Sequence, residues 1–179
     1  YGLAENSVGL TFPPVGRGPI VDRVHRPALS RNGRARTAQP GDATALAFVA
    51  CGRPIAGHEV RIVDEADVEL PERTEGRLQF KGPSATRGYF RNEEKTKALF
   101  DGEWLESGDR AYIASGDVFI TGRIKDMIIK AGRNIYPHEL EELVGGMEGV
   151  RKGCVAAFPS TFDGADTERL VLLDETRLT

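Results

Sequence analysis

The sequence predicts a mixed α/β to α+β protein, in which a sheet-rich segment is followed by a small α+β module. Two observations carry this prediction. Strand-like runs dominate the first two-thirds of the 179 residues, and several of them alternate apolar and polar side chains as a half-covered strand does. After about Lys125 the order of expected elements becomes strand, helix, strand, strand, which is typical of an α+β unit.

The first part of the chain divides into an irregular segment and a buried strand. Residues 13–45 are rich in Pro, Gly and Arg and have little periodicity, so we expect an irregular covering segment with one short strand near 20–24. Residues 45–52 form an apolar run that ends at a glycine, and a proline follows soon after. This punctuation predicts a strand that is buried in the core.

Two alternating runs and one helix are expected next. The runs 58–65 and 75–83 alternate apolar and polar side chains, which predicts two strands that each have one covered face. Residues 91–100 predict a helix, because Asn92 can cap it and two glutamates stand where the helix dipole favours negative charge. The Ser-Gly-Asp sequence at 107–109 lies between apolar flanks and predicts a tight turn.

The last third of the chain holds the predicted α+β module. The sequences DVFITGR and DMIIKAG predict two strands that are separated by a few residues. Residues 137–146 predict a short helix, with a proline in its first turn and a glycine near its end. Two further strands are expected in the runs GCVAAFP and ERLVLLDE. We place the domain boundary in the charged stretch at 123–126.

Composition and charge exclude several classes of function. The chain carries 24 Lys and Arg against 27 Asp and Glu, so we expect no nucleic-acid partner and no electrostatic attraction to an anionic membrane. No apolar run is long enough for a membrane span. The two cysteines and three histidines lack the spacing of metal ligands, and we expect a cytoplasmic protein with reduced thiols. The chain begins at Tyr1 within what reads as a motif, so we expect a fragment of a longer protein.

Single residues give weak signals for chemistry. Asp109 follows a glycine, and its carboxylate can accept two hydrogen bonds from a ribose diol or merely satisfy the backbone of its own turn. Glu5 can be a ligand for a hard cation, or a surface or capping residue. The sequence contains neither a Walker-type phosphate loop nor a complete dinucleotide fingerprint. The residues alone leave these alternatives open.

The order of five motifs is more specific than any one of them. YGLAE is followed by CGRPIAGHEVRIVD, GRLQFKGPSATRGYF, WLESGDR and TGRIKDMIIKAGRNIYPHELEE. In this order the chain resembles the adenylate-forming (AMP-binding) superfamily, which includes acyl-CoA synthetases, fatty-acyl-AMP ligases, adenylation domains and luciferases. The resemblance covers nearly the whole chain. Ala4, where many members have Thr, the sequence GRNIYP and the Arg-rich stretch at 19–35 indicate the acyl-CoA synthetase and fatty-acyl-AMP ligase branch.

The resemblance implies a division of the chain into parts of two domains. Residues 1–123 would form the sheet-rich C-terminal part of a large AMP-binding N-domain, residues 124–125 a hinge, and residues 126–179 part of a small α+β lid domain. The family's upstream phosphate loop and the late catalytic lysine of the lid are absent from the sequence. The resemblance therefore implies an incomplete lid, no catalytic residue within the chain, and an inactive fragment.

The resemblance also implies an activity for the full-length protein. Members use ATP and Mg²⁺ to convert a carboxylic acid, here a fatty acid, into an acyl-adenylate and pyrophosphate. The acyl group then passes to a thiol, either CoA or the phosphopantetheine of an acyl carrier protein. Two alternatives stay open: an adenylation domain for amino or aryl acids, and a non-catalytic nucleotide-binding remnant.

Site residues carry over by their places in the motifs. By its place in YGLAE, Glu5 would hold the magnesium ion on the triphosphate. Tyr1 would lie against the adenine, and Gly2 would form part of the same nucleotide site. Asp109 would bind the ribose hydroxyls, and Arg123 would add a charge-assisted hydrogen bond to the nucleotide.

The remaining assignments concern the lid and two departures from the family pattern. Lys125 would be the pivot about which the lid swings between two orientations, with Asp126 beside it, and Gly132 would let the pantetheine arm pass close to the backbone. Ala4 cannot give a phosphate the hydroxyl hydrogen bond that Thr gives elsewhere. Arg110 places a charge where the family usually has Leu, and the sequence offers no account of it.

Overall fold

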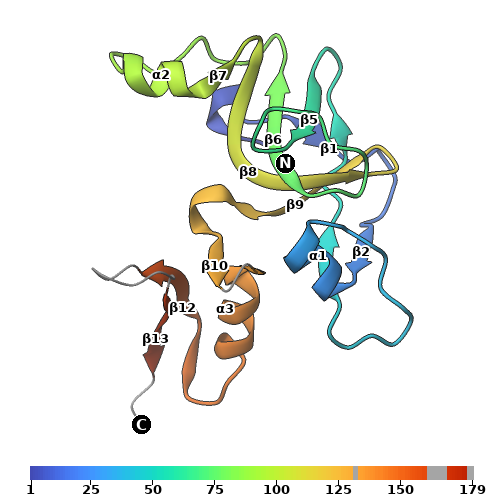
Figure 1. Ribbon diagram of the computed structural model, residues 1–179, viewed down its shortest axis with the longest axis vertical. Helices are drawn as coiled ribbons and strands as arrows, with labels where there is room; N and C mark the ends of the chain where they lie inside the picture. Colours follow the sequence, from blue (N-terminus) through green and yellow to red (C-terminus); the bar gives the residue numbers. More distant parts are fainter. Residues whose placement is uncertain (131–132, 161–168, 177–179) are drawn as a thin grey trace. The chain divides into compact units, whose positions relative to one another are not determined.

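The computed structural model describes residues 1–130, 133–160 and 169–176. The chain divides into two compact units, Tyr1–Thr121 and Gly122–Thr179, and Figure 1 shows the elements of each. The boundary that the sequence predicted after residue 123 lies beside this division. The predicted hinge and the domain assignments themselves stay predictions.

The first unit is mostly strand. Its elements in chain order are η1 (Ala4–Asn6), β1 (Thr11–Phe12), β2 (Val21–Val24), α1 (Arg26–Asn32), β3 (Leu46–Val49), β4 (Arg53–Pro54), β5 (Glu59–Val63), β6 (Gly76–Lys81), α2 (Glu93–Leu99), β7 (Phe100–Asp101), β8 (Trp104–Ala114) and β9 (Asp117–Arg123), whose last two residues belong to the second unit.

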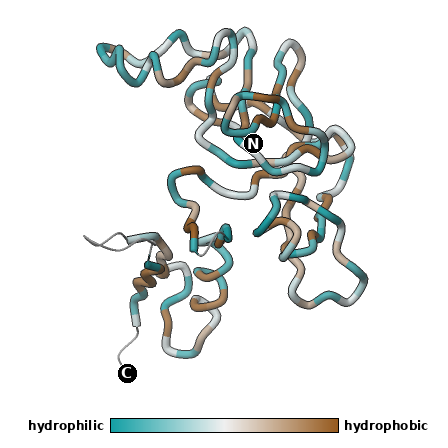
Figure 2. The backbone as a smooth tube through the Cα atoms, in the orientation of Figure 1, coloured by the Kyte–Doolittle hydropathy of each residue, from teal (hydrophilic) through white to brown (hydrophobic). Residues whose placement is uncertain are grey.

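A five-stranded antiparallel sheet forms the centre of this unit. Its order is β5-β6-β8-β7, and β9 also pairs with β8. Ile62 of β5 lies opposite Leu78 of β6, and Phe80 of β6 lies opposite Leu105 of β8. Figure 2 shows hydrophobic residues grouped along the strands, whereas helix α2 is largely hydrophilic. One hydrophobic core cluster of this unit consists of eight buried residues: Leu10, Ile62, Leu78, Phe80, Leu99, Leu105, Ala111 and Val118.

The alternating runs become strands where the sequence predicted them, as β5 and β6. The predicted helix is α2, and the Asn92 side chain caps it by accepting a hydrogen bond from the Lys95 backbone N–H at 3.0 Å. The short strand expected near 20–24 is β2, which pairs with β3. The expectation of an otherwise irregular covering segment was incomplete, because α1 lies within it. This helix has a proline in its first turn and ends at Gly33, in the left-handed conformation.

The second unit contains η2 (Ile124–Asp126), β10 (Ile128–Lys130), β11 (Arg133–Ile135), α3 (Pro137–Gly145), β12 (Val150–Ser160) and β13 (Arg169–Thr176). β10 pairs with β11 and β12 pairs with β13, both antiparallel. α3 packs against β12, where Glu141 accepts a hydrogen bond from the Ala157 backbone N–H at 3.0 Å. The sequence missed β11, which has only three residues. The predicted fold class, a sheet-rich part followed by an α+β part, is confirmed.

Candidate functional site

Asp109 lies on a bulge in the middle of a long strand. Gln79 of β6 pairs with Glu106 of β8, whereas Arg77, two residues earlier, pairs with Arg110. β8 therefore carries two extra residues opposite Leu78, and Gly108 accommodates them with a φ of +78°. The predicted tight turn at 107–109 was wrong, because the strand continues in one direction and pairs with β6 on both sides of the bulge.

The bulge holds the Asp109 carboxylate in a nearly buried position. The Asp109 residue is 7% exposed. Its backbone N–H donates to the Ser107 hydroxyl oxygen at 3.1 Å, and that hydroxyl donates to the Leu78 carbonyl at 2.7 Å. Ser107 thus ties the extra residues to β6 and orients the acid that follows them.

Tyr1 lies against this acid, although 107 residues separate the two in sequence. The Tyr1 hydroxyl donates to Oδ2 of Asp109 at 2.5 Å. The Tyr1 backbone is fixed by Leu10 and Thr11, whose N–H groups donate to its carbonyl at 3.1 and 3.0 Å. Burial, followed by the hydrogen bond and charge of Asp109, raises the pKa of Tyr1 well above its usual value of 10.0. The phenol is therefore protonated and remains a donor to Asp109 at physiological pH.

Gly2 and Glu5 belong to the tight N-terminal turn that follows Tyr1. A Cβ at Gly2 would lie 1.5 Å from the Val8 carbonyl oxygen, so only glycine fits there. Glu5 lies in η1, and its carbonyl accepts a hydrogen bond from the Thr86 N–H at 2.7 Å. Ala4 in the same turn is exposed.

The Glu5 carboxylate is bonded to a residue that sequence reasoning missed. The Tyr89 hydroxyl donates to Oε1 of Glu5 at 2.6 Å. This hydrogen bond, together with burial and the Glu5 charge, raises the pKa of Tyr89 to about 12. The available signal was the place of Tyr89 in the motif GRLQFKGPSATRGYF, one of the five that carry the resemblance.

A small cavity adjoins these residues in the first unit. Its volume is about 250 Å³. It is lined by Glu5, Tyr89, Lys95, Ala98, Leu99, Glu106, Ser107 and Gly108. The cavity therefore connects the Glu5 turn with the bulge that carries Asp109, so the structure brings three of the predicted nucleotide residues, Tyr1, Glu5 and Asp109, to one part of the unit.

Arg110, which the sequence left unexplained, has ionic partners. It follows the bulge and lies opposite Arg77. Its guanidinium is 3.5 Å from the Glu75 carboxylate and 3.7 Å from the Glu65 carboxylate. The Glu75 side chain is fully buried, and removing one partner of a buried ion pair is costly because the other charge is left uncompensated. The charge at position 110 therefore stabilises Glu75.

The other predicted site residues belong to the second unit, which is described by itself. Arg123 ends β9, and Lys125 and Asp126 lie exposed in η2. The Met127 N–H donates to the Arg123 carbonyl at 3.1 Å across this short helix. Gly132 lies outside the described residues.

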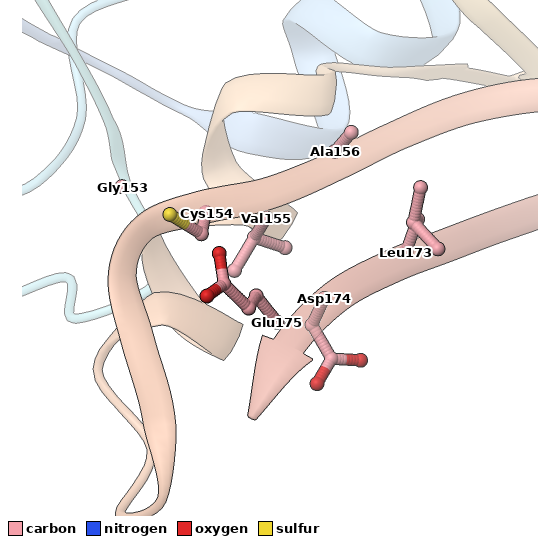
Figure 3. Close-up of a pocket in the computed structure, with 7 residues that line it drawn as sticks. All are labelled: Gly153, Cys154, Val155, Ala156, Leu173, Asp174 and Glu175. Atoms are coloured by element: carbon pink, nitrogen blue, oxygen red, sulfur yellow. The ribbon is translucent and has the colours of Figure 1, made fainter. Parts of the chain in front are cut away.

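A second hollow lies along β12 and β13 and has a volume of about 540 Å³. Figure 3 shows its lining, with the Cys154 thiol and the carboxylates of Asp174 and Glu175. The Glu175 carboxylate already accepts a hydrogen bond from Arg151 at 2.8 Å. Within the described part of the chain, no group of three or more His, Cys, Asp or Glu side chains could hold a metal ion.

The surroundings of Glu5 fit the way in which proteins usually bind magnesium. Mg²⁺ usually keeps several waters and is bound by one or two carboxylates together with substrate phosphates. Glu5 offers one carboxylate beside a cavity, and Oε1 alone is engaged with Tyr89. The residues present therefore fit a magnesium ion that arrives with a nucleotide.

Comparison with known proteins decides the family. No family model matches the chain. A Caulobacter vibrioides protein provisionally named an acyl-CoA synthetase is 37% identical over 160 residues, which cover 88% of this chain and 28% of that protein. A solved structure from a study of fatty acyl-adenylate ligases from E. coli and L. pneumophila matches 100% of this chain and 32% of its own, with a TM-score of 0.89 and 32% identity. This chain belongs to the adenylate-forming superfamily.

Other adenylate-forming relatives differ in their names. The 4-hydroxyphenylalkanoate adenylyltransferase of Mycobacterium marinum is 35% identical over 188 residues, 98% of this chain and 29% of that protein. The structure of McyG A-PCP complexed with phenylalanyl-adenylate matches 97% of this chain and 28% of its own, with a TM-score of 0.74 and 33% identity. The chain thus spans roughly 30% of the length of the adenylate-forming proteins it matches. Membership alone selects neither the acid nor the acyl acceptor.

Proposed function

We propose that this chain is part of an ATP-dependent ligase that activates a fatty acid as an acyl-adenylate and passes the acyl group to a thiol. The thiol is that of CoA or of carrier-protein phosphopantetheine. The observation that carries the proposal is the hydrogen bond between Tyr1 and the nearly buried Asp109, beside a cavity lined by Glu5. The likeness to a structure from the fatty acyl-adenylate ligase study, over the whole chain, favours a fatty acid.

In this proposal Asp109 binds the ribose of ATP. A carboxylate has about four lone-pair positions, and the hydrogen bond from Tyr1 to Oδ2 uses one of them. Ribose hydroxyls are suitable donors to such an acid, and Tyr1 holds it in place. The Tyr1 ring and the Gly2 backbone contribute the adjoining part of the nucleotide site.

Glu5 is the residue that would hold Mg²⁺, which when bound neutralises phosphate charge as pyrophosphate leaves. Arg123 would contact the nucleotide, and Lys125 with Asp126 would form the hinge. Gly132 would line the path of the pantetheine arm. These roles are proposals that rest on the places of the residues in the family motifs.

The test is ATP–pyrophosphate exchange in the full-length protein with three sets of acids: fatty, aryl and amino. We expect exchange with fatty acids, followed by acyl transfer to CoA or to a phosphopantetheinylated carrier protein. The 179-residue chain assayed alone is the matched control, and we expect it to be inactive. Exchange with none of the acids would contradict the proposal and favour a nucleotide-binding remnant.

A second candidate is an adenylation domain for aryl or amino acids. Two observations favour it: the similarity to the 4-hydroxyphenylalkanoate adenylyltransferase and to the structure that contains phenylalanyl-adenylate. Exchange with aryl or amino acids and none with fatty acids would establish this alternative.

The location of the protein is a separate question. No helix of the described residues is long and apolar enough to cross a membrane, and a cytoplasmic location stays a prediction.

A further inference from the structure

Glu5 is held at two points by one short segment, residues 86–89. The Thr86 backbone N–H donates to the Glu5 carbonyl at 2.7 Å, and the Tyr89 hydroxyl donates to the Glu5 carboxylate at 2.6 Å. The first contact fixes the backbone of the turn, and the second fixes the side chain. The segment therefore determines where the carboxylate lies relative to the cavity that both Glu5 and Tyr89 line.

Tyr89 is in turn anchored to the helix that follows. Its backbone N–H donates to the Thr96 hydroxyl at 2.9 Å, and that hydroxyl donates to the Asn92 carbonyl at 2.7 Å. Thr96 belongs to α2, whose start is capped by the Asn92 side chain. The phenol thus projects from a fixed backbone.

The Tyr89 hydrogen bond leaves the other oxygen of Glu5 available. The hydroxyl engages Oε1, so Oε2 can face a cation. In metal sites, groups that hydrogen-bond a carboxylate ligand orient it and contribute to metal affinity.

We propose that Tyr89 is a positioning residue whose hydroxyl fixes the Glu5 carboxylate for the divalent cation that accompanies ATP. The inference rests on the proposed function, which gives Glu5 the role of a magnesium ligand. It adds a residue to which neither the family motifs nor the sequence assigned a role. In this inference Tyr89 acts through Glu5 and does not touch the nucleotide.

The test compares Tyr89→Phe with the wild type in the full-length protein. Calorimetric titration with a non-hydrolysable ATP analogue, at a series of Mg²⁺ concentrations, measures binding without turnover. We expect the Mg²⁺ concentration that gives half-maximal enhancement of nucleotide affinity to rise about tenfold. Nucleotide affinity without Mg²⁺ should be unchanged. An unchanged or lower Mg²⁺ requirement in Tyr89→Phe would overturn the inference.

Tyr112→Phe is the matched control. It also removes one phenolic hydroxyl from the first unit, where that group donates to Asp22 at 2.8 Å. Tyr112 does not line the cavity beside Glu5, so its loss should leave the Mg²⁺ dependence unchanged. An equal shift in Tyr112→Phe would mean that any lost hydroxyl loosens the unit, and it would overturn the specific role of Tyr89.

A double variant shows whether Tyr89 acts through Glu5. We expect Glu5→Gln to reduce strongly the enhancement of nucleotide affinity by Mg²⁺. Tyr89→Phe should add little to the effect of Glu5→Gln, because the effects of coupled residues are not additive. Fully additive effects would overturn the inference. If the wild type exchanges pyrophosphate and only the Tyr89 result is negative, the proposed function stands. If Glu5→Gln leaves the Mg²⁺ dependence unchanged, the assignment of Glu5 and this inference both fall.

Discussion

Individual side chains in the first unit are oriented by contacts with residues that are distant in sequence. Tyr1 holds Asp109, and Tyr89 holds Glu5. Both phenols have raised pKa values and are protonated donors. The site thus depends on two neutral donors that keep two acids in place. Single substitutions of these side chains should therefore change nucleotide binding more than folding.

Removing the acid at the bulge should weaken ATP use. In the full-length protein we expect Asp109→Ala to lower kcat/KM for ATP roughly tenfold to a hundredfold, because a hydrogen bond to a charged group contributes about 1.5–3 kcal/mol. The variant also leaves the Tyr1 hydroxyl without its acceptor. Asp42→Ala, at a half-buried acid whose carboxylate bonds to Thr44, is the control. Unchanged ATP kinetics in Asp109→Ala would remove this residue from the site.

The pKa of Tyr89 should report the presence of Glu5. A nearby carboxylate stabilises the protonated phenol and so raises its pKa. Glu5→Gln removes that charge and should lower the pKa of Tyr89 from about 12 toward the ordinary value of about 10. Ring-labelled tyrosine NMR across a pH titration measures it, with Tyr89→Phe identifying the signal. A pKa that stays near 12 in Glu5→Gln would show that Glu5 does not cause the shift.

At the scale of elements, the short η2 turn at Ile124–Asp126 is the candidate hinge. Proline fixes φ near −65°, so Lys125→Pro should hold the turn in one of two lid orientations. We expect the two half-reactions to be affected unequally, whichever of them is favoured. The measurement is ATP–pyrophosphate exchange beside acyl transfer from a preformed acyl-adenylate, in the full-length protein.

Lys125→Ala is the control for the hinge, because it removes the side chain without restricting φ. We expect it to affect both half-reactions far less than the proline does. Equal losses in both half-reactions for Lys125→Pro, with the fold intact, would mean that Lys125 is not the pivot.

Elements with a clear local signal could be predicted from the sequence. β5 and β6 show the alternating pattern, and α2 has its cap and acidic first turn. α1 was missed because its residues, RPALSRN, lie in a Pro- and Arg-rich segment without a long apolar stripe. The bulge at 107–109 was predicted as a turn because a glycine between polar residues is compatible with a tight turn and with a β-bulge. Only the pairing of β8 with β6 distinguishes the two structures.

For the candidate site, too, the sequence gives local signals and does not show which distant residues are paired. Motif order assigned Tyr1, Glu5 and Asp109 to a nucleotide site, because each has a fixed place in its motif, and these roles stay predictions. It could not identify the bond between Tyr89 and Glu5, which joins residues 84 positions apart. Nor could it pair Arg110 with Glu75, since that pairing depends on the register of two strands.

At the scale of the whole molecule, the two units differ in their cores. All eight residues of the core cluster belong to the first unit. The second unit has few buried apolar side chains among its described residues: Met127, Ile128, Tyr136 and Ala157. A unit of this size with so small a core should be marginally stable by itself. The first unit should therefore be the independently stable part.

This difference predicts the behaviour of residues 1–121 alone. The single tryptophan, Trp104, lies in this unit, and Arg61 and Lys81 approach the centre of its ring to 4.4 and 4.7 Å. We expect urea unfolding monitored by Trp104 fluorescence to have nearly the same midpoint in residues 1–121 as in the 179-residue chain. A truncated chain that is unfolded before urea is added would show that the second unit supplies essential stability.

The bulge in β8 has a consequence for how such a protein can change over generations. The insert is two residues long, an even number, so the side chains of β8 beyond it keep the faces they would have without it. An in-frame deletion of the two codons for Gly108 and Asp109 should leave Ser107 opposite Leu78 and restore an uninterrupted ladder. Thermal unfolding of the deletion variant should stay close to that of the parent chain, while nucleotide affinity is lost. A gene could therefore discard Asp109 in one step and retain an intact scaffold for selection to reuse.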